Sequence, residues 1–142
     1  MSHPTTQMTA IVCHAPQDYR VAQVARPSPG PRELVIRIGA CGICASDCKC
    51  WSGAKMFWTG DDPWVKAPVI PGHEFVGHVE EMGEGAAGHF GVAIGDHVIA
   101  EQIVPCERCR FCRSGQYWTC DVHNMFGFQR RLVRRCEWET FM

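Results

Sequence analysis

Four closely spaced cysteines constrain the fold of this chain more than any other feature of its sequence. They follow the pattern Cys-x2-Cys-x2-Cys-x7-Cys, made by Cys106, Cys109, Cys112 and Cys120. Thiolates on a tight turn can face the same side and bind one tetrahedral metal ion, and a fourth sulfur closes its coordination shell. The pattern therefore predicts a structural zinc site. The spacing also allows an iron–sulfur cluster, and the simplest alternative is a set of unrelated or disulfide-bonded cysteines.

The expected compartment favours metal over disulfides. The chain has ten cysteines in 142 residues, and its first seven residues lack the apolar centre of a signal peptide. No apolar run is long enough to span a bilayer. We therefore expect a cytoplasmic protein without membrane association, where clustered cysteines bind metal more often than they pair. The 14 basic and 15 acidic residues give a formal charge of −1, which argues against a nucleic-acid partner recruited by positive charge.

A second group of potential ligands comes from two separate segments. Cys44 opens the run Cys-Ala-Ser-Asp, and His73 and Glu74 follow a Pro-Gly pair. A cysteine, a histidine and a carboxylate suit a zinc ion that keeps an open coordination position. Ser46 lies close enough in sequence to exchange a proton with a ligand on that metal, and Asp47 can hold the other ring nitrogen of His73. The alternative is a core cysteine and a surface histidine without metal.

Short strands separated by glycine and proline predict an all-β, barrel-like core. Residues 33–38 alternate with a period of two, which predicts a strand with Leu34, Ile36 and Ile38 on one buried face. A short helix is expected from Ser46 to Trp51, and one helical turn within 109–118. The other strands are expected at 8–14, 20–25, 75–80 and 96–101.

The second group of ligands is also part of a longer motif. The run Gly72-His73-Glu74-x2-Gly77, followed by Gly83 and Ala86, resembles the zinc signature of the medium-chain, zinc-dependent alcohol dehydrogenases. The Cys44-x-Ser46-Asp47 run, the Gly95-Asp96-His97-Val98 run and the four-cysteine spacing are similar to elements of the same family. They occur in the family's order over roughly 8–128. Within the family, this sequence most resembles the polyol-oxidising members, including the sorbitol dehydrogenases.

This resemblance implies a GroES-like β-barrel catalytic domain, normally followed by a Rossmann domain that binds NAD or NADP. It implies that Cys44 and His73 bind a catalytic zinc directly, with Glu74 either as an alternating ligand or as a residue beside the ligands. Zinc would lower the pKa of a small-molecule alcohol or polyol, and hydride would pass to nicotinamide. In this scheme the catalytic roles of Ser46 and Asp47 are to pass the proton outward and to orient His73. The four cysteines would hold the structural zinc.

The chain also departs from the family pattern. We expect no Gly-x-Gly-x-x-Gly motif that follows a strand and opens a helix, and Lys49 stands where some members carry a histidine that ends the proton relay. In the family, the third protein ligand and the remaining barrel strands come from sequence beyond the four-cysteine lobe. After Phe128 this chain becomes arginine-rich. We therefore interpret 1–128 as an incomplete GroES-like domain with a zinc lobe at about 101–122, and 129–142 as an atypical segment, disordered or read in a shifted frame.

These features together predict a truncated zinc-dependent alcohol or polyol dehydrogenase. We expect these residues to lack the Rossmann domain, so NAD or NADP is expected only in a full-length form. The chain alone is expected to be inactive, with an incomplete catalytic zinc site and uncovered barrel edges that promote self-association. A non-catalytic zinc-binding protein is the main alternative. A zinc-ribbon nucleic-acid module is a weaker one, because it leaves Gly72-His73-Glu74 unexplained.

Two further sets of residues each allow two interpretations. Aromatic side chains between the two ligand segments either line a substrate cleft or pack in the core; they are Trp51, Phe57, Trp58 and Trp64. Three further cysteines are either core residues or substitutes for the missing zinc ligand; they are Cys41, Cys48 and Cys50.

Overall fold

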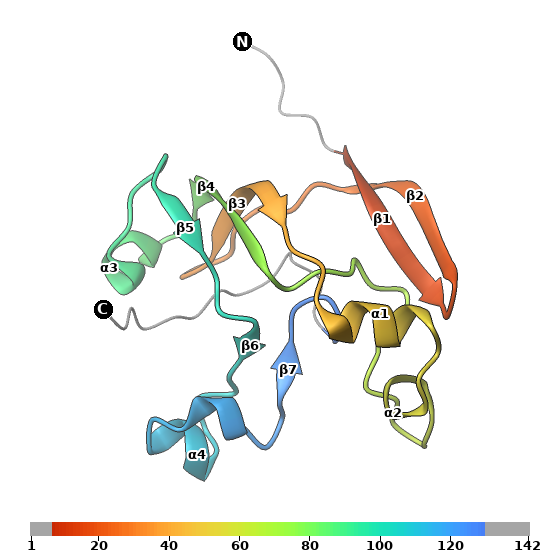
Figure 1. Ribbon diagram of the computed structural model, residues 1–142. Helices are drawn as coiled ribbons and strands as arrows, with labels where there is room; N and C mark the ends of the chain where they lie inside the picture. The colour runs from red at the N-terminus through yellow and green to blue at the C-terminus, as the bar shows by residue number, and fades with distance from the viewer. Residues whose placement is uncertain (1–6, 130–142) are drawn as a thin grey trace.

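The computed structural model describes residues 7–129, and its main elements are strands (Figure 1). This confirms the predicted mainly-β class. The strands are β1 (Gln7–Ala15), β2 (Asp18–Ala25), β3 (Leu34–Cys41), β4 (Phe75–Met82), β5 (His97–Ile99), β6 (Ile103–Val104) and β7 (Asn124–Met125). The helices are α1 (Ala45–Trp51), α2 (Lys55–Trp58), α3 (Ala86–Phe90), α4 (Arg110–Arg113) and a 3-10 turn, η1 (Tyr117–Thr119).

The strands form three small sheets. β1 and β2 make an antiparallel hairpin, β3, β4 and β5 make an antiparallel sheet in that order, and β6 pairs with β7. Figure 1 shows the hairpin on the right beside α1 and α2, and the four-cysteine lobe with α4 at the bottom. Within 7–129 the sheets do not close into a barrel, which agrees with the incomplete barrel predicted from the sequence.

Two glycines of the signature motif let chain segments approach closely. A Cβ on Gly77 would lie 2.2 Å from the backbone oxygen of Arg37, on the neighbouring strand β3. A Cβ on Gly83 would lie 1.7 Å from the backbone oxygen of Gly30. No side chain fits at either distance. The glycines of the motif therefore have a structural reason that is separate from metal binding.

The predicted buried face of β3 was wrong in part. Val35 is the buried residue, whereas Ile38 is 41% exposed. The register with β4 shifts between Val35 and Ile36, so the alternation of the sequence does not continue unbroken across the strand. Leu34, Ile36 and Ile38 instead line an apolar groove of about 500 Å³ that also includes Phe126.

Two clusters of buried side chains form the core, and the segment 125–128 belongs to both. One cluster contains Phe57, Met125 and Phe128, together with Cys13, Cys50, Val65 and Val69. The other is built from Phe75, Phe90 and Phe126, together with Ala86 and Val104. Successive residues of one short segment thus enter different clusters and tie the hairpin side of the molecule to the three-stranded sheet.

Most of the aromatic residues pack as core rather than as a cleft wall. Phe57 is 2% exposed, and Trp58 and Trp64 pack against the same cluster. The indole nitrogen of Trp58 donates to the backbone oxygen of Cys50 at 2.8 Å. Trp51 differs, because it is 45% exposed. Its ring meets that of Tyr19 edge-on, with the two ring centroids 5.0 Å apart. The core interpretation is therefore confirmed for three of the four.

Helix α1 begins earlier than expected. α1 is capped by Cys44 rather than by Ser46, because the Asp47 carboxylate accepts a hydrogen bond from the Cys44 backbone nitrogen at 2.9 Å. Two further short helices, α2 and α3, occur where neither a helix nor a strand was predicted. Contrary to expectation, a Gly-x-Gly-x-x-Gly run at 83–88 does follow a strand, β4, and leads into a helix, α3. The strands on either side of α3 are antiparallel, so the run is not part of a dinucleotide-binding βαβ unit. The helical turn expected within 109–118 is confirmed by α4.

The arginine-rich segment predicted at 129–142 lies outside the described residues except for Gln129. The same holds for Cys136. No helix among residues 7–129 is long and apolar enough to cross a membrane.

The close approach at Gly77 predicts a large effect of a single methyl group. We expect Gly77→Ala to lower the free energy of unfolding by about 1–3 kcal/mol, because β3 and β4 must separate to admit the new carbon. Gly88→Ala is the matched control. A Cβ there meets nothing within 4 Å, and alanine in α3 is expected to stabilise by about 0.5–1 kcal/mol. Urea unfolding of the zinc-loaded chain measures both, and equal stabilities for the two variants would contradict the close approach.

Candidate metal centres

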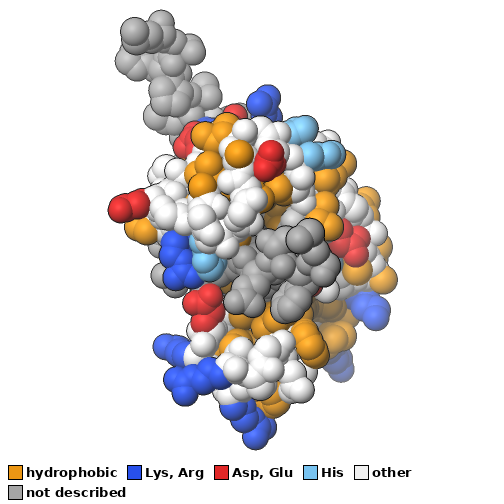
Figure 2. All heavy atoms as spheres, turned by 90° about the vertical axis from the view of Figure 1, so that its left-hand side faces the viewer, with side chains coloured by type: hydrophobic (Ala, Val, Ile, Leu, Met, Phe, Trp, Pro, Cys, Tyr) orange, Lys and Arg blue, Asp and Glu red, His pale blue; other side chains and the backbone are white. Residues whose placement is uncertain are grey.

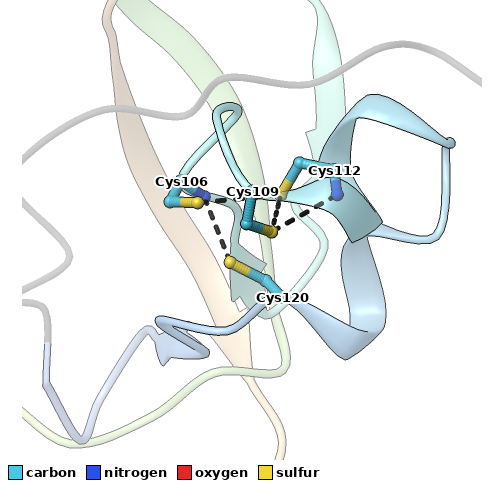
Figure 3. Close-up of side chains that lie close together, drawn as sticks. All are labelled: Cys106, Cys109, Cys112 and Cys120. Carbon is cyan, nitrogen blue, oxygen red and sulfur yellow. Dashed lines mark hydrogen bonds between the residues drawn. The ribbon is translucent and has the colours of Figure 1, made fainter.

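The four cysteines of the lobe lie together as predicted. Figure 3 shows their sulfur atoms turned toward one another. The Sγ atoms of Cys109 and Cys112 are 3.4 Å apart, and those of Cys106 and Cys112 are 4.0 Å apart. All four sulfurs lie within 4.8 Å of one another.

Local backbone structure explains why the sulfurs converge. Cys109 caps α4, and its sulfur accepts a hydrogen bond from the Cys112 backbone nitrogen at 3.4 Å. The sulfur of Cys120 accepts one from the Cys106 backbone nitrogen at 3.3 Å. These bonds turn both ends of the lobe inward. Glu107 has a positive φ of 58° between them, which makes the turn tight.

The donor set fits one zinc ion. Four sulfurs at about 2.3 Å from a tetrahedral zinc lie about 3.8 Å from one another. The observed distances of 3.4 and 4.0 Å fall on either side of that value. A cluster with several irons would hold its cysteine sulfurs farther apart than a single ion does. All nine cysteines within 7–129 are free thiols, so the disulfide alternative finds no support there.

The electrostatics of the lobe also favour a cation. Backbone N–H groups, first that of Asp121 and then that of Cys112, lower the pKa of Cys109 to about 6. Burial raises the pKa of Cys112 to about 12, and the neighbouring thiol of Cys109 adds to the rise. Burial also acts to raise the pKa of Cys120, but backbone N–H groups outweigh it and the pKa is lowered. Cys109 and Cys120 thus favour thiolate charge that a divalent ion would neutralise.

The second group of ligands is also brought together. Cys44 lies at the start of α1, and His73 and Glu74 immediately precede β4. Their ligand atoms lie within 4.8 Å of one another. His73 is 1% exposed, so it is not the surface histidine of the alternative interpretation. Glu74 is exposed and Cys44 is partly buried, which leaves this group open on one side.

His73 is held between an aromatic ring and two polar side chains. The Phe128 ring lies 5.2 Å from the imidazole, centroid to centroid. Nε2 lies 3.3 Å from the Ser46 hydroxyl, and Nδ1 lies 3.6 Å from Oδ1 of Asp47. Both Nδ1 and that carboxylate oxygen are buried without a hydrogen-bond partner. They face each other, so a small approach would satisfy both and leave Nε2 as the ligand atom.

Asp47 connects the two ligand segments. Its Oδ2 accepts the hydrogen bond from the backbone of Cys44, and its Oδ1 faces His73. One carboxylate therefore positions the loop that carries the sulfur and faces the ring that carries the nitrogen. The sequence predicted the contact with His73 but not the contact with Cys44.

The loop before His73 rests directly on the segment that contains Phe128. Gly72 and Gly127 have positive φ angles of 107° and 78°. A Cβ on Gly127 would lie 2.5 Å from the backbone oxygen of Gly72. This contact places Phe128 on the imidazole. Sequence reasoning missed it, although the Phe-Gly-Phe run at 126–128 was a signal for a close backbone approach.

The remaining cysteines near the second group are placed elsewhere. None of Cys41, Cys48 and Cys50 belongs to the three-ligand group among the described residues. Cys50 is buried in the core, where its sulfur accepts a hydrogen bond from the Tyr19 hydroxyl at 3.4 Å. Burial raises the pKa of its thiol, so it stays neutral. Cys41 and Cys48 are exposed.

A cleft of about 610 Å³ opens beside His73 and Glu74. Its wall includes Glu101 and, from the four-cysteine lobe, Tyr117. Burial raises the pKa of the Tyr117 phenol, and the nearby Glu101 carboxylate raises it further. None of the four aromatic residues considered for a cleft wall lines it. The lobe therefore takes part in the surface beside the second group of ligands.

Comparison with known proteins gives a consistent result. The sequence profile of the alcohol dehydrogenase GroES-like domain matches residues 30–140. The chain is 53% identical over 128 residues to an erythritol/L-threitol dehydrogenase of Mycolicibacterium smegmatis. This match covers 88% of this chain and 35% of that protein. It is 37% identical over 108 residues to a sorbitol dehydrogenase of Macaca fascicularis, a match that covers 76% of this chain and 28% of that protein.

A solved structure agrees with the sequence comparisons. A protein described as a zinc-binding dehydrogenase from Sinorhizobium meliloti, bound to NADP, superposes with a TM-score of 0.73 at 30% identity. The match covers 89% of this chain and 34% of that one. This chain therefore belongs to the alcohol dehydrogenase GroES-like domain family. It spans about a third of the length of the relatives that it matches.

The four-sulfur geometry predicts the outcome of removing one ligand. We expect Cys109→Ser to lose one zinc per chain and to loosen the lobe, because the binding energy of a structural metal is also folding energy. Zinc content by mass spectrometry and proteolysis within the lobe measure the two effects. Cys48→Ser, which changes an exposed cysteine outside both groups, is the control. Unchanged zinc content in Cys109→Ser would show that the four sulfurs do not share an ion.

Proposed function

We propose that this chain is the metal-binding part of a zinc-dependent dehydrogenase that oxidises a small alcohol or polyol with NAD or NADP. The observation that carries the proposal is the buried His73, grouped with Cys44 and Glu74 in a member of this family that also has the four-cysteine lobe. The polyol assignment is supported by the relatives named as erythritol/L-threitol and sorbitol dehydrogenases. In this proposal residues 1–128 form the domain and about 101–122 form its lobe.

The two metal sites would have different tasks. Four sulfurs would surround the lobe zinc and leave no position for a reactant, which makes that site structural. Cys44, His73 and Glu74 would hold the second zinc with one side open. Zinc bound there would supply a Lewis acid toward a substrate hydroxyl.

Three side chains of this chain would support that chemistry. The Asp47 carboxylate faces Nδ1 of His73 and would fix the proton on that nitrogen, which leaves the lone pair on Nε2. The Phe128 ring would keep the imidazole in place. The Ser46 hydroxyl, 3.3 Å from Nε2, can accept a proton from the reacting hydroxyl and donate its own toward solvent.

Self-association of the 142-residue chain is part of the same proposal. Several large apolar side chains are exposed on strands, among them Val21 at 76% and Ile99 at 79%. The apolar groove beside β3 adds to this surface. Apolar edges of this kind tend to associate when nothing covers them.

Unequal ligand sets predict unequal metal affinity. We expect a chelator to remove zinc first from the group with Cys44, because only three ligands are assembled there and Glu74 is exposed. The lobe zinc should leave in a second, slower phase. A colorimetric chelator that reports released zinc measures both phases. Cys44→Ser should abolish the first phase only, and release of all zinc in one phase would contradict the assignment.

Activity provides the direct test of the proposed function. We expect the 142-residue chain by itself to show no turnover, because positioning of nicotinamide against the substrate supplies much of the rate of hydride transfer. Replacing the sequence after Phe128 with the corresponding remainder of the erythritol/L-threitol dehydrogenase should give NAD(P)-dependent oxidation of a four-carbon polyol.

The same chimera supplies its own controls. Cys44→Ser should abolish its activity, whereas Cys48→Ser should leave it within about twofold. NAD-dependent turnover by the 142-residue chain that Cys44→Ser abolishes would show that no further domain is needed. A folded chimera that retains activity with Cys44→Ser would overturn the proposed role of this group.

A further inference from the structure

Two histidines lie side by side on the exposed face of the three-stranded sheet, outside both groups of cysteine-containing ligands. His78 on β4 is the direct register partner of His97 on β5. Their rings stack with centroids 4.6 Å apart and an angle of 16° between the planes. Both residues are exposed. Figure 2, viewed from the side of α3 and β5, shows neighbouring histidine side chains at the surface.

The hydrogen bonding of His78 sets which nitrogen carries its proton. Its Nδ1 lies 3.2 Å from the backbone oxygen of Gly95. A carbonyl oxygen can only accept, so Nδ1 is the donor and Nε2 of the neutral ring keeps a free lone pair. Histidines that bind metal through Nε2 commonly donate Nδ1–H to a backbone carbonyl in this way.

The backbone keeps the two rings together. The Val79 nitrogen donates to the Asp96 oxygen at 2.9 Å, and the Gly95 nitrogen donates to the Val79 oxygen at 2.8 Å. These ladder bonds lie next to His78 and His97 in sequence and fix the distance between the two strands. A metal that joins the rings would therefore find the two strands already held together.

The charged residues next to the pair in the sheet have hydrogen-bond or ion-pair partners of their own. Arg37 on β3 is the other register partner of His78, and its guanidinium lies 3.8 Å from the Glu80 carboxylate. Oδ2 of Asp96 accepts a hydrogen bond from the Ala93 backbone nitrogen. A bound cation would meet the positive charge of Arg37 together with the negative charges of Glu80 and Asp96.

We propose that His78 and His97 form a two-histidine surface site for a divalent transition-metal ion that prefers imidazole, such as Ni²⁺, Cu²⁺ or Zn²⁺. Water would complete the coordination. Nitrogens bound at about 2.1 Å and at right angles lie about 3 Å apart, so the stacked rings need to tilt toward each other. The site cross-links β4 and β5 and is separate from the proposed dehydrogenase chemistry.

Nickel titration tests this site. The probe is Ni²⁺, added to the tag-free 142-residue chain that has been loaded with zinc and dialysed, with heat of binding as the readout. We expect one Ni²⁺ per chain at this site, and a loss of affinity of at least tenfold in His78→Gln and in His97→Gln, because each variant leaves a single ligand. His14→Gln, which changes an exposed histidine on β1, is the matched control and should bind as the parent chain does.

Each other outcome overturns the two-histidine site. Equal binding by the parent chain and by both variants would place the nickel on other ligands, such as thiols. A loss in only one variant would mean that a single histidine binds. No binding by the parent chain would remove the site. Circular dichroism verifies that both glutamine variants keep the fold, which is expected because both positions are exposed.

Discussion

The close packing of residues 125–128 against the loop at Gly72 is the contact on which the rest of this structure depends. Gly127 approaches the Gly72 backbone too closely for any side chain. On either side of it, Phe126 enters the core of the three-stranded sheet and Phe128 enters the core beneath the hairpin. The segment therefore joins both cores, and it places an aromatic ring on His73. The packing of this segment therefore helps to bury His73 and to hold its imidazole.

Asp47 supplies the polar counterpart of that contact. It caps α1 at Cys44 with one oxygen and faces the buried imidazole with the other. Burying a histidine nitrogen and a carboxylate oxygen without partners costs free energy, and their mutual approach recovers it. A metal on Nε2 would strengthen the same contact, because it favours the neutral ring with its proton on Nδ1. The geometry of the second group is thus prepared by residues that are not themselves the ligands.

Sequence reasoning succeeded where chemistry depends on short spacing. The convergence of the four cysteines follows from their positions on one tight loop, and the strand at β4 follows from apolar residues between glycines. The grouping of Cys44 with His73 needed the resemblance to a known family, because 28 intervening residues hide the contact. From the spacing alone, a surface histidine without metal was nearly as well supported as a zinc ligand at His73.

The features that the sequence did not predict depend on contacts between distant segments. The register shift after Val35 changes which residues of β3 are buried, and it arises from pairing with β4. The N-cap of α1 is Cys44 because its backbone N–H donates a hydrogen bond to the Asp47 carboxylate, a contact that the propensity of Ser46 does not reveal. The role of Phe128 depends on a backbone approach at Gly72; the glycine between two phenylalanines signals a close approach, but not the segment that it meets.

Cobalt(II) titration of the chain tests the central claim most directly, namely that two distinct metal sites are built from these residues. Thiolate-to-metal absorption reports how many sulfurs bind each ion. We expect two phases, a first with strong absorption from four thiolates and a second, weaker one that Cys44→Ser removes while Cys109→Ser does not. A single phase, or a second phase that persists in Cys44→Ser, would contradict the account.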